Sequence, residues 1–234
     1  MYWYHSPLLS VTHGFSTRSG GISPAPFHSL NFAGRDDEAS NIKENRRRAL
    51  AALNLSVENT AYLKQVHSNT VCLAHPGPQT GDALVTKEKG LTLAVAAADC
   101  YPLLFHDPVN NIIGAAHAGW RGTVARVAQN TIYEMVQLGA DTSAIKVAIG
   151  PGISCEKFEV GSEVIEQFAR AGFPDYCFKN SHIDLVAANK FVLNESGIAE
   201  ENTWAMKRCT FEADFFSFRR DKGKTGRMWA VISL

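Results

Sequence analysis

Residues 91–138 hold the clearest folding signal in the chain, because apolar strands lead through a turn of small residues into an amphipathic helix. In YPLLFHDPVNNIIGAAHAG, two apolar runs flank the turn sequence DPVNN, which predicts a β-hairpin. From Val124 onward, apolar residues recur at helical spacing, with Thr123 as a candidate N-cap and Gly139 as a candidate C-terminal stop. This segment predicts that helices pack against a sheet.

The remaining segments mix helix and strand without the regular order of repeated β-α-β units. Helices are expected over 38–53, 162–172 and 185–196, with Ser162 and Asp184 as N-caps of the last two. Further strands are expected over 62–66, 70–74, 91–100, 145–150, 203–211 and 228–234. We therefore predict an α+β fold in which mixed sheets are covered by outer helices, formed by residues 1–234 as a single domain.

The composition indicates a globular protein and argues against several classes. Hydrophobic residues make up 45% of the 234 residues, which suffices for a substantial core. Lys plus Arg and Asp plus Glu both number 23, so we expect no nucleic-acid partner. No apolar run reaches about 18 residues, and residues 1–18 lack the pattern of a secretory signal, so we expect no membrane partner.

The cysteines favour a reducing compartment, because they are odd in number and widely separated. The five are Cys72, Cys100, Cys155, Cys177 and Cys209. A disulfide framework would require closely spaced pairs. We therefore expect a cytoplasmic protein, either a monomer or a homodimer.

Three side chains of types that commonly bind metals stand at predicted strand ends or bends: His67, Cys100 and His117. Each is flanked by small or polar residues, in QVHSN, AADCYP and AAHAGW. Two imidazoles and a thiolate can form a three-ligand zinc site with a fourth position open to water or substrate. The long spacings match no compact metal motif, and a buried cysteine with two packed histidines would explain the same residues.

The segment AAHAGWRGT also indicates a site for an anion. A tight turn at Ala118–Gly119 would bring the backbone close to the candidate ligands. Gly122–Thr123 would then start a helix whose free N–H groups attract anions. Arg121 adds a guanidinium fork suited to phosphate or carboxylate, although pairing with a surface acid is an alternative for it.

Three further polar residues are candidates for the same site. Arg18, in a loop rich in Gly and Pro, and Arg220, in SFRR, would assist in anion binding unless they are solvated surface residues. Asp99 precedes the candidate ligand Cys100 and could act as a base or orient a ligand. A lone aspartate at a strand end is also a common cap.

A series of short motifs in a fixed order resembles one family, the laccase-domain or multicopper polyphenol oxidase-like family. The motifs are SLNFAG, KQVHSNTV, GDALVT, ADCYPLLFHDP, AAHAGWRGT, GPGISCEKFEVG, IDLVAANK, CTFEADFFSFRRD and TGRMWAVI. They cover about residues 12–232. Members of this family are also called purine nucleoside phosphorylases and, in one bacterial role, peptidoglycan editing factors.

The resemblance implies a fold, a metal and a reaction. The fold would resemble that of toxin deamidases of the cysteine-hydrolase kind, and the zinc ligands of the family fall on His67, Cys100 and His117. Members phosphorolyse adenosine, inosine and methylthioadenosine, and they deaminate adenosine. The resemblance therefore implies one zinc site, with copper as an alternative metal, and a purine nucleoside and phosphate as substrates. Together with the local patterns above, it makes Cys100, His117, Asp99 and Arg121 the catalytic candidates.

Other functions remain open at this point. Coupled copper oxidases use several copper sites with His-x-His pairs, whereas this chain has eight histidines and no such pair. The H-x-E and P-C-x-x-C signature of zinc base deaminases is absent as well. Cys100 could instead be a nucleophile with His117 as its base. A non-catalytic partner in cell-wall synthesis is the remaining alternative.

Overall fold

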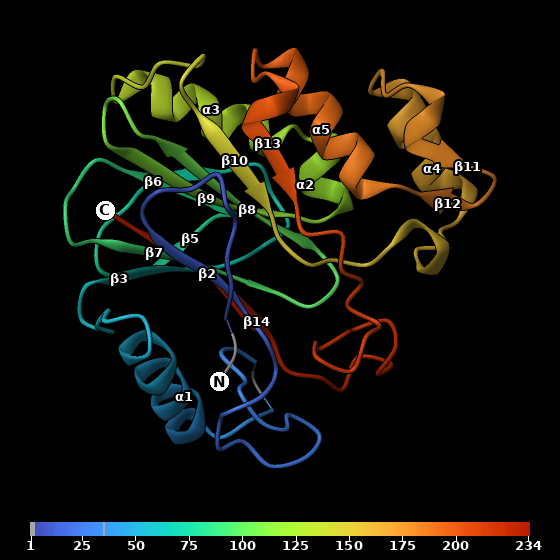
Figure 1. Ribbon diagram of the computed structural model, residues 1–234. Coiled ribbons are helices and arrows are strands. Elements are labelled where there is room, and N and C mark those ends of the chain that lie inside the picture. Colours follow the sequence, from blue (N-terminus) through green and yellow to red (C-terminus); the bar gives the residue numbers. More distant parts are fainter. Residues whose placement is uncertain (1–2, 35) are drawn as a thin grey trace.

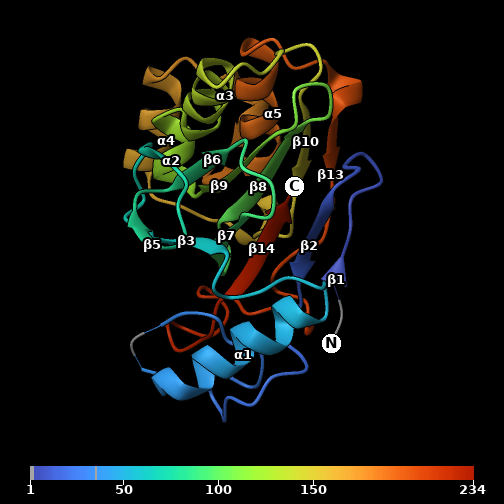
Figure 2. The same cartoon turned by 90° about the vertical axis from the view of Figure 1, so that its left-hand side faces the viewer.

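The computed structural model describes residues 3–34 and 36–234. Two six-stranded sheets pack face to face, and helices cover their outer faces (Figure 1). Figure 2 shows the resulting order of layers, with α1 on one side of the paired sheets and α2 to α5 on the other. This arrangement confirms the predicted α+β fold of mixed sheets with outer helices.

Both sheets contain parallel and antiparallel pairs. The first has the order β1-β2-β14-β7-β3-β5, with strands at Trp3–Tyr4 (β1), Thr12–Ser16 (β2), Thr60–Lys64 (β3), Gly77–Thr80 (β5), Thr92–Ala97 (β7) and Met228–Ser233 (β14). The second has the order β13-β10-β8-β9-β6-β4, with strands at Val71–Leu73 (β4), Ala83–Thr86 (β6), Tyr101–Asp107 (β8), Ile112–Ala118 (β9), Lys146–Ile149 (β10) and Thr203–Ala205 (β13). A separate short pair consists of Phe178–Lys179 (β11) and His182–Ile183 (β12).

The helices divide between the two outer faces. They span Ala39–Ala51 (α1), Trp120–Val124 (α2), Val127–Gln137 (α3), Ser162–Arg170 (α4) and Leu185–Glu195 (α5). Short 3₁₀ turns lie at Cys155–Lys157, Asp175–Cys177 and Glu200–Asn202. No helix within the described residues is both long and apolar enough to cross a bilayer.

The central strands are continuous apolar runs in the sequence because successive side chains point to opposite faces of the sheet and both faces are buried. In β7, Leu93 and Val95 enter the core between the sheets, while Ala94 packs toward α1. In β8, Leu104 enters the core between the sheets, whereas Phe105 packs with the cluster beneath α3. Because both faces of each central strand are buried, neither face requires polar residues.

The connection from β7 to β8 carries the chain from the first sheet to the second. Asp99 lies in this turn with φ of 92°, in the left-handed region that residues other than glycine rarely adopt. Strands β8 and β9 then pair antiparallel, with Pro102 opposite His117, as the predicted hairpin requires. The crossing therefore places Cys100 beside the end of β9.

The prediction of a single helix from Val124 onward, with Thr123 as N-cap and Gly139 as its stop, is wrong, because the structure divides this segment into α2 and α3. Arg126 takes a left-handed conformation, with φ of 64°, between the two helices. Its guanidinium donates to Glu195 and lies over the Phe173 ring, so tertiary contacts hold the break.

Two of the predicted N-caps are also wrong. Gly119 is the N-cap of α2, so Thr123 lies inside the helix, and Gly161 rather than Ser162 caps α4. The third prediction is confirmed, since the Asp184 side chain accepts from the Ala187 N–H.

His106 is a buried polar side chain whose position makes a testable prediction. It is 2% exposed, and neither ring nitrogen has a hydrogen-bond partner among the described residues. Burial lowers the pKa of His106, so the folded chain holds it neutral, whereas the unfolded chain binds a proton at higher pH. His106 therefore destabilises the folded state increasingly as pH falls below about 6.5.

His106→Leu is expected to increase the free energy of unfolding by about 1 kcal/mol near pH 7, and by more near pH 5. Urea unfolding at both values measures this change. His75→Leu, at an exposed histidine, serves as the control and should show no such pH dependence. An equal effect of His106→Leu at both pH values would contradict the assignment.

Candidate active site

Three segments that are distant in sequence bring His67, Cys100 and His117 together. His67 follows β3, Cys100 lies between β7 and β8, and His117 lies near the end of β9. One ligand atom from each lies within 4.8 Å of the others. The two imidazole rings meet edge to face, with centroids 5.0 Å apart. The structure therefore brings together the three residues that the sequence proposed as ligands.

The donor set fits a single zinc ion. Tetrahedral bonds of about 2.0–2.3 Å would place the donor atoms about 3.5 Å apart. The three donor atoms lie within 4.8 Å of one another, so a bound ion would draw these side chains inward. One thiolate and two imidazoles are ligands that zinc commonly takes, although copper accepts the same donors.

Asp82 lies directly before β6 and accepts hydrogen bonds that hold His67 and His117 in place. Its Oδ1 accepts from Nδ1 of His117 and from the backbone N–H of His67, each at 3.0 Å. Its Oδ2 accepts from the backbone N–H of Ser68 at 2.6 Å and from that of Val66 at 3.2 Å. Because Nδ1 of His117 is held in this way, Nε2 is the nitrogen that faces the candidate metal position.

Burial and mutual attraction set the charges of the central pair. Burial acts to raise the pKa of the Cys100 thiol, but the adjacent His117 and His67 outweigh it and lower the pKa to about 6. Burial acts to lower the pKa of His117, but the Cys100 thiolate and Asp82 raise it to about 9. The attraction between the two groups therefore favours the thiolate form of Cys100, which is the form that binds metal.

Gly119 explains the small residues of AAHAGW. A Cβ at this position would lie 2.7 Å from Sγ of Cys100 and 3.4 Å from Cδ2 of His67. Only glycine lets the backbone pass this close to the candidate ligands. The predicted turn thus serves to pack the chain against the cluster.

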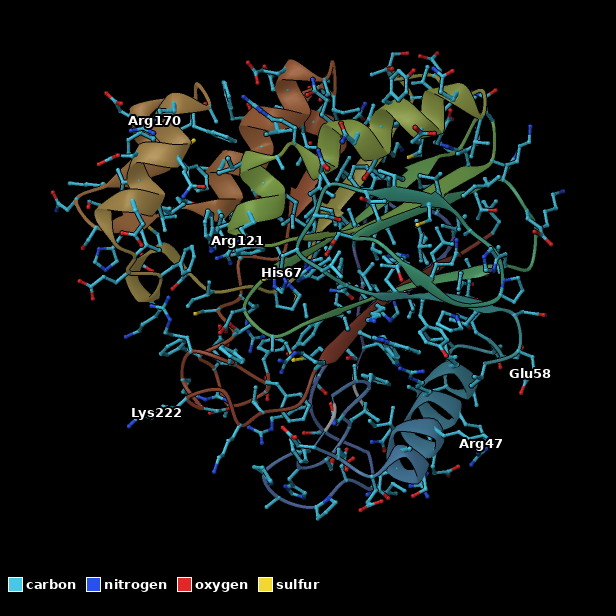
Figure 3. All side chains as sticks on the ribbon, turned by 180° about the vertical axis from the view of Figure 1, so that it is seen from behind. Arg47, Glu58, His67, Arg121, Arg170 and Lys222 are labelled. Carbon is cyan, nitrogen blue, oxygen red and sulfur yellow. The ribbon has the colours of Figure 1, made fainter. Side chains whose placement is uncertain are left out.

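The cluster forms part of the wall of a cavity of about 580 Å³. This volume lies within the range of small-molecule sites. Aromatic and basic side chains line the same cavity, including Trp120, Phe218, Arg121, Arg219 and Arg227. His67 and Arg121, a residue of α2, line this cavity and lie near each other in Figure 3, whereas Arg47 and Arg170 lie at the edge of the molecule. The cavity therefore combines candidate metal ligands, aromatic faces and cations.

Only one of the three arginines predicted to bind an anion lines this cavity. Arg121 lies at its wall, with its guanidinium 4.3 Å from the centroid of the Trp120 ring. Arg18 instead donates to the carbonyl of His28 and stacks on Phe216. Arg220 pairs with Asp221 and donates to three backbone carbonyls. Through these contacts, Arg18 and Arg220 hold loops in place, and neither side chain lines the cavity.

The helix start that we predicted at Gly122–Thr123 lies earlier in the chain. Helix α2 is only five residues long, and it begins at Trp120. The backbone N–H of Thr123 donates to the carbonyl of Gly119 at 2.8 Å and is therefore not free. Thr123 therefore offers no backbone donor to an anion in the cavity.

Asp99 anchors the loop that spans residues 206–227. Its Oδ1 accepts from Oγ1 of Thr210 at 2.6 Å, and its Oδ2 accepts from the backbone N–H of Arg219 at 2.7 Å. The side chain lines the cavity, but neither oxygen is free of a protein donor. In Figure 1 this loop leaves β13 and returns to the start of β14, and Asp99 fastens it at two points.

Comparison with known proteins places the chain in a family. A family model described as "Multi-copper polyphenol oxidoreductase laccase" matches residues 12–234. The chain belongs to this family. The resemblance predicted from the motifs is therefore confirmed.

Proteins similar to this laccase-family chain include some that are named as enzymes and some with solved structures. It is 48% identical to the purine nucleoside phosphorylase of Deinococcus radiodurans, over 98% of this chain and 91% of that protein. It is 40% identical to a protein named adenosine deaminase from an unknown prokaryotic organism, over 64% of this chain and 61% of that protein. The crystal structure of YlmD from Geobacillus stearothermophilus matches with a TM-score of 0.94 and 32% identity, covering 100% of this chain and 96% of that one.

Sequence reasoning missed several residues of this laccase-family site. Asp82 stands in GDALVT as an acid directly before an apolar strand, a position where a buried carboxylate could have been suspected. Arg219 is adjacent to the predicted Arg220, and only the loop conformation distinguishes them. Arg227 and Phe218 carry no local signal, because their placement depends on how the 206–227 loop folds over the sheet ends.

Proposed function

We propose that this protein is a metal-dependent purine nucleoside phosphorylase. It cleaves adenosine, inosine and S-methyl-5′-thioadenosine with phosphate, releasing the base and a ribose 1-phosphate, with adenosine deamination as a side activity. The observation that carries the proposal is the His67, Cys100 and His117 cluster in the wall of a cavity lined by arginines and aromatic rings. The names of the 48% and 40% identical relatives support the class of reaction.

Different side chains of the cavity would bind the metal, the purine and the phosphate. Zinc held by His67, Cys100 and His117 would supply a Lewis acid with an open fourth position. Asp82 fixes the ring of His117 so that Nε2 points at the candidate metal position. The rings of Trp120 and Phe218 offer apolar faces to a purine, and Arg121 at the wall attracts phosphate.

The test measures metal content and phosphate dependence together. Protein purified without added metal should carry about one zinc ion per chain. It should release hypoxanthine from inosine and adenine from adenosine only when phosphate is present. A chelator should abolish this release, and added zinc should restore it. Equal release without phosphate, or unchanged turnover in His117→Ala, would contradict the proposal.

A second candidate function is hydrolysis with Cys100 as the nucleophile. The observation that favours it is the order Cys100, His117, Asp82, in which the carboxylate orients an imidazole next to a thiolate. Such an arrangement can operate without a metal. Stoichiometric loss of activity after iodoacetamide treatment of chelated, still active protein would support this candidate over the metal-dependent one.

Copper oxidase chemistry receives less support from this chain. Among residues 3–34 and 36–234, His67, Cys100 and His117 form the one group of three or more potential ligands. A coupled copper centre requires several such groups. The metal analysis above also tests this alternative, because stoichiometric copper with phenol oxidation would favour it.

A further inference from the structure

Arg227 is a cavity residue with unused hydrogen-bond donors. It lies directly before β14 and shares the cavity wall with Cys100 and His117. Its Nη1 donates to the carbonyls of Thr225 at 3.0 Å and Gly226 at 2.9 Å. Nε and Nη2 donate to none of the described residues. A guanidinium has five N–H groups, so the Nε and Nη2 edge, which forms a two-pronged fork, remains available.

The surroundings hold this fork in place. The guanidinium carbon lies 5.5 Å from the centroid of the Phe218 ring. The backbone N–H of Arg227 donates to Oδ1 of Asn31, and its carbonyl accepts from the N–H of Phe32. A side chain fixed in this way loses little conformational freedom when it binds an anion.

Arg227 forms no ion pair with a carboxylate in the described part of the chain, and the nearby Asp99 and Cys100 only partly offset the cost of burying its charge. No carboxylate oxygen among residues 3–34 and 36–234 lies within 4.0 Å of its nitrogens. The cavity carboxylate Asp99 already accepts from Thr210 and Arg219. Because a half-buried cation is costly without a partner, an oxyanion from solution would complete this site.

We propose that Nε and Nη2 of Arg227 bind the phosphate that attacks the nucleoside, an assignment that rests on the proposed phosphorolysis. A phosphate oxygen forms the bond to C1′ of the ribose while the bond from C1′ to the base nitrogen breaks. The electron pair of the broken bond stays on the base, and the proton of hydrogen phosphate passes to it. The products are the neutral base and a ribose 1-phosphate.

The test compares Arg227→Met with Arg46→Met. Arg46 is a matched control, because its guanidinium also stacks on aromatic rings, Tyr62 and Trp229, and donates to a carbonyl, but it lies outside the cavity lining. Inorganic phosphate should raise the melting temperature of the wild type and of Arg46→Met, relative to chloride at equal ionic strength. It should leave that of Arg227→Met unchanged.

Kinetics provide the second measurement. Arg227→Met should raise the KM for phosphate about tenfold or more, with a much smaller change in the KM for inosine. Stabilisation of Arg227→Met by phosphate to the wild-type extent, absence of any phosphate effect on the wild type, or an equal rise in both KM values would overturn the assignment. If phosphate protection depends on Arg227 but the wild type does not cleave inosine, phosphorolysis fails while the oxyanion site stands. If the wild type cleaves inosine and the variant keeps its phosphate KM, only the assignment of Arg227 fails.

Discussion

Replacing His67 by asparagine is expected to remove the bound metal and to lower kcat/KM for phosphate-dependent cleavage of inosine about 1,000-fold, since a catalytic metal contributes several kcal/mol. His67 supplies one of the three candidate ligand atoms, and its side chain is exposed, so its loss removes little packing. Asparagine is chosen because His67 has φ of 58°, a conformation that asparagine tolerates. Elemental analysis and steady-state kinetics measure the two effects.

The same variant separates the metal-dependent function from the cysteine nucleophile. In the nucleophile alternative, Cys100, His117 and Asp82 carry the reaction, and His67 is dispensable. Activity within a fewfold of the wild type in metal-free His67→Asn would therefore refute the metal-dependent proposal. His75→Asn, at an exposed histidine outside the cluster, is the control and should keep both metal and activity.

Replacing Asp82 by asparagine is expected to weaken metal binding about 10- to 100-fold, because the group that orients a ligand is lost while the ligands remain. The free energy of unfolding should also fall by about 2–3 kcal/mol, because this fully buried carboxylate accepts hydrogen bonds from His117 and from the backbone of the 66–68 segment. Competition with a chelator of known affinity measures the first effect, and urea unfolding measures the second.

The loss of stability in this variant should depend on pH. Burial acts to raise the pKa of Asp82, but hydrogen bonds from His117 and Ser68 outweigh it and lower the pKa to about 2. A carboxylate with a lowered pKa stabilises the fold above its ordinary pKa, and that stabilisation is lost as pH falls. The difference in the free energy of unfolding between wild type and variant should be largest near pH 7 and should become smaller below about pH 4.

Asp107→Asn is the matched control for Asp82→Asn. Asp107 is also fully buried and accepts from the backbone N–H groups of Val109, Asn110 and Asp141, but it lies at the far end of β8 from Cys100. The Asp107→Asn variant should have a lower free energy of unfolding and an unchanged metal affinity. Equal effects of the two variants on metal affinity would show that Asp82 acts only through general stability.

The elements that could be predicted from sequence are those with strong local patterns. The β8–β9 hairpin follows from two apolar runs around DPVNN, and the end of α3 follows from Gly139, which has φ of 106°. The three candidate ligands could be proposed because each residue type is chemically distinctive and stands at a strand end. Strand β2, in contrast, was missed, since its five residues THGFS carry little hydrophobic alternation.

The errors arose where distant contacts outweighed local preference. The break at Arg126 depends on Glu195 and Phe173, which lie far away in sequence, so the pattern of α3 gave no sign of it. The choice of cavity arginines depended on the fold of the 206–227 loop, which Asp99 fastens from across the molecule. Propensity within a short window cannot contain such contacts.

The amino-acid sequence alone determined the type of fold, the family and the identity of the three candidate ligands, because hydrophobic period and residue chemistry are local properties. Only the tertiary structure decided that these ligands meet, that Asp82 orients them, and that Arg227 rather than Arg18 or Arg220 faces the cavity. The physical reason is that these relations depend on how two sheets pack and how loops close over their ends. Contacts of this kind join residues far apart along the chain, and the number of residues between two positions does not predict their distance in space.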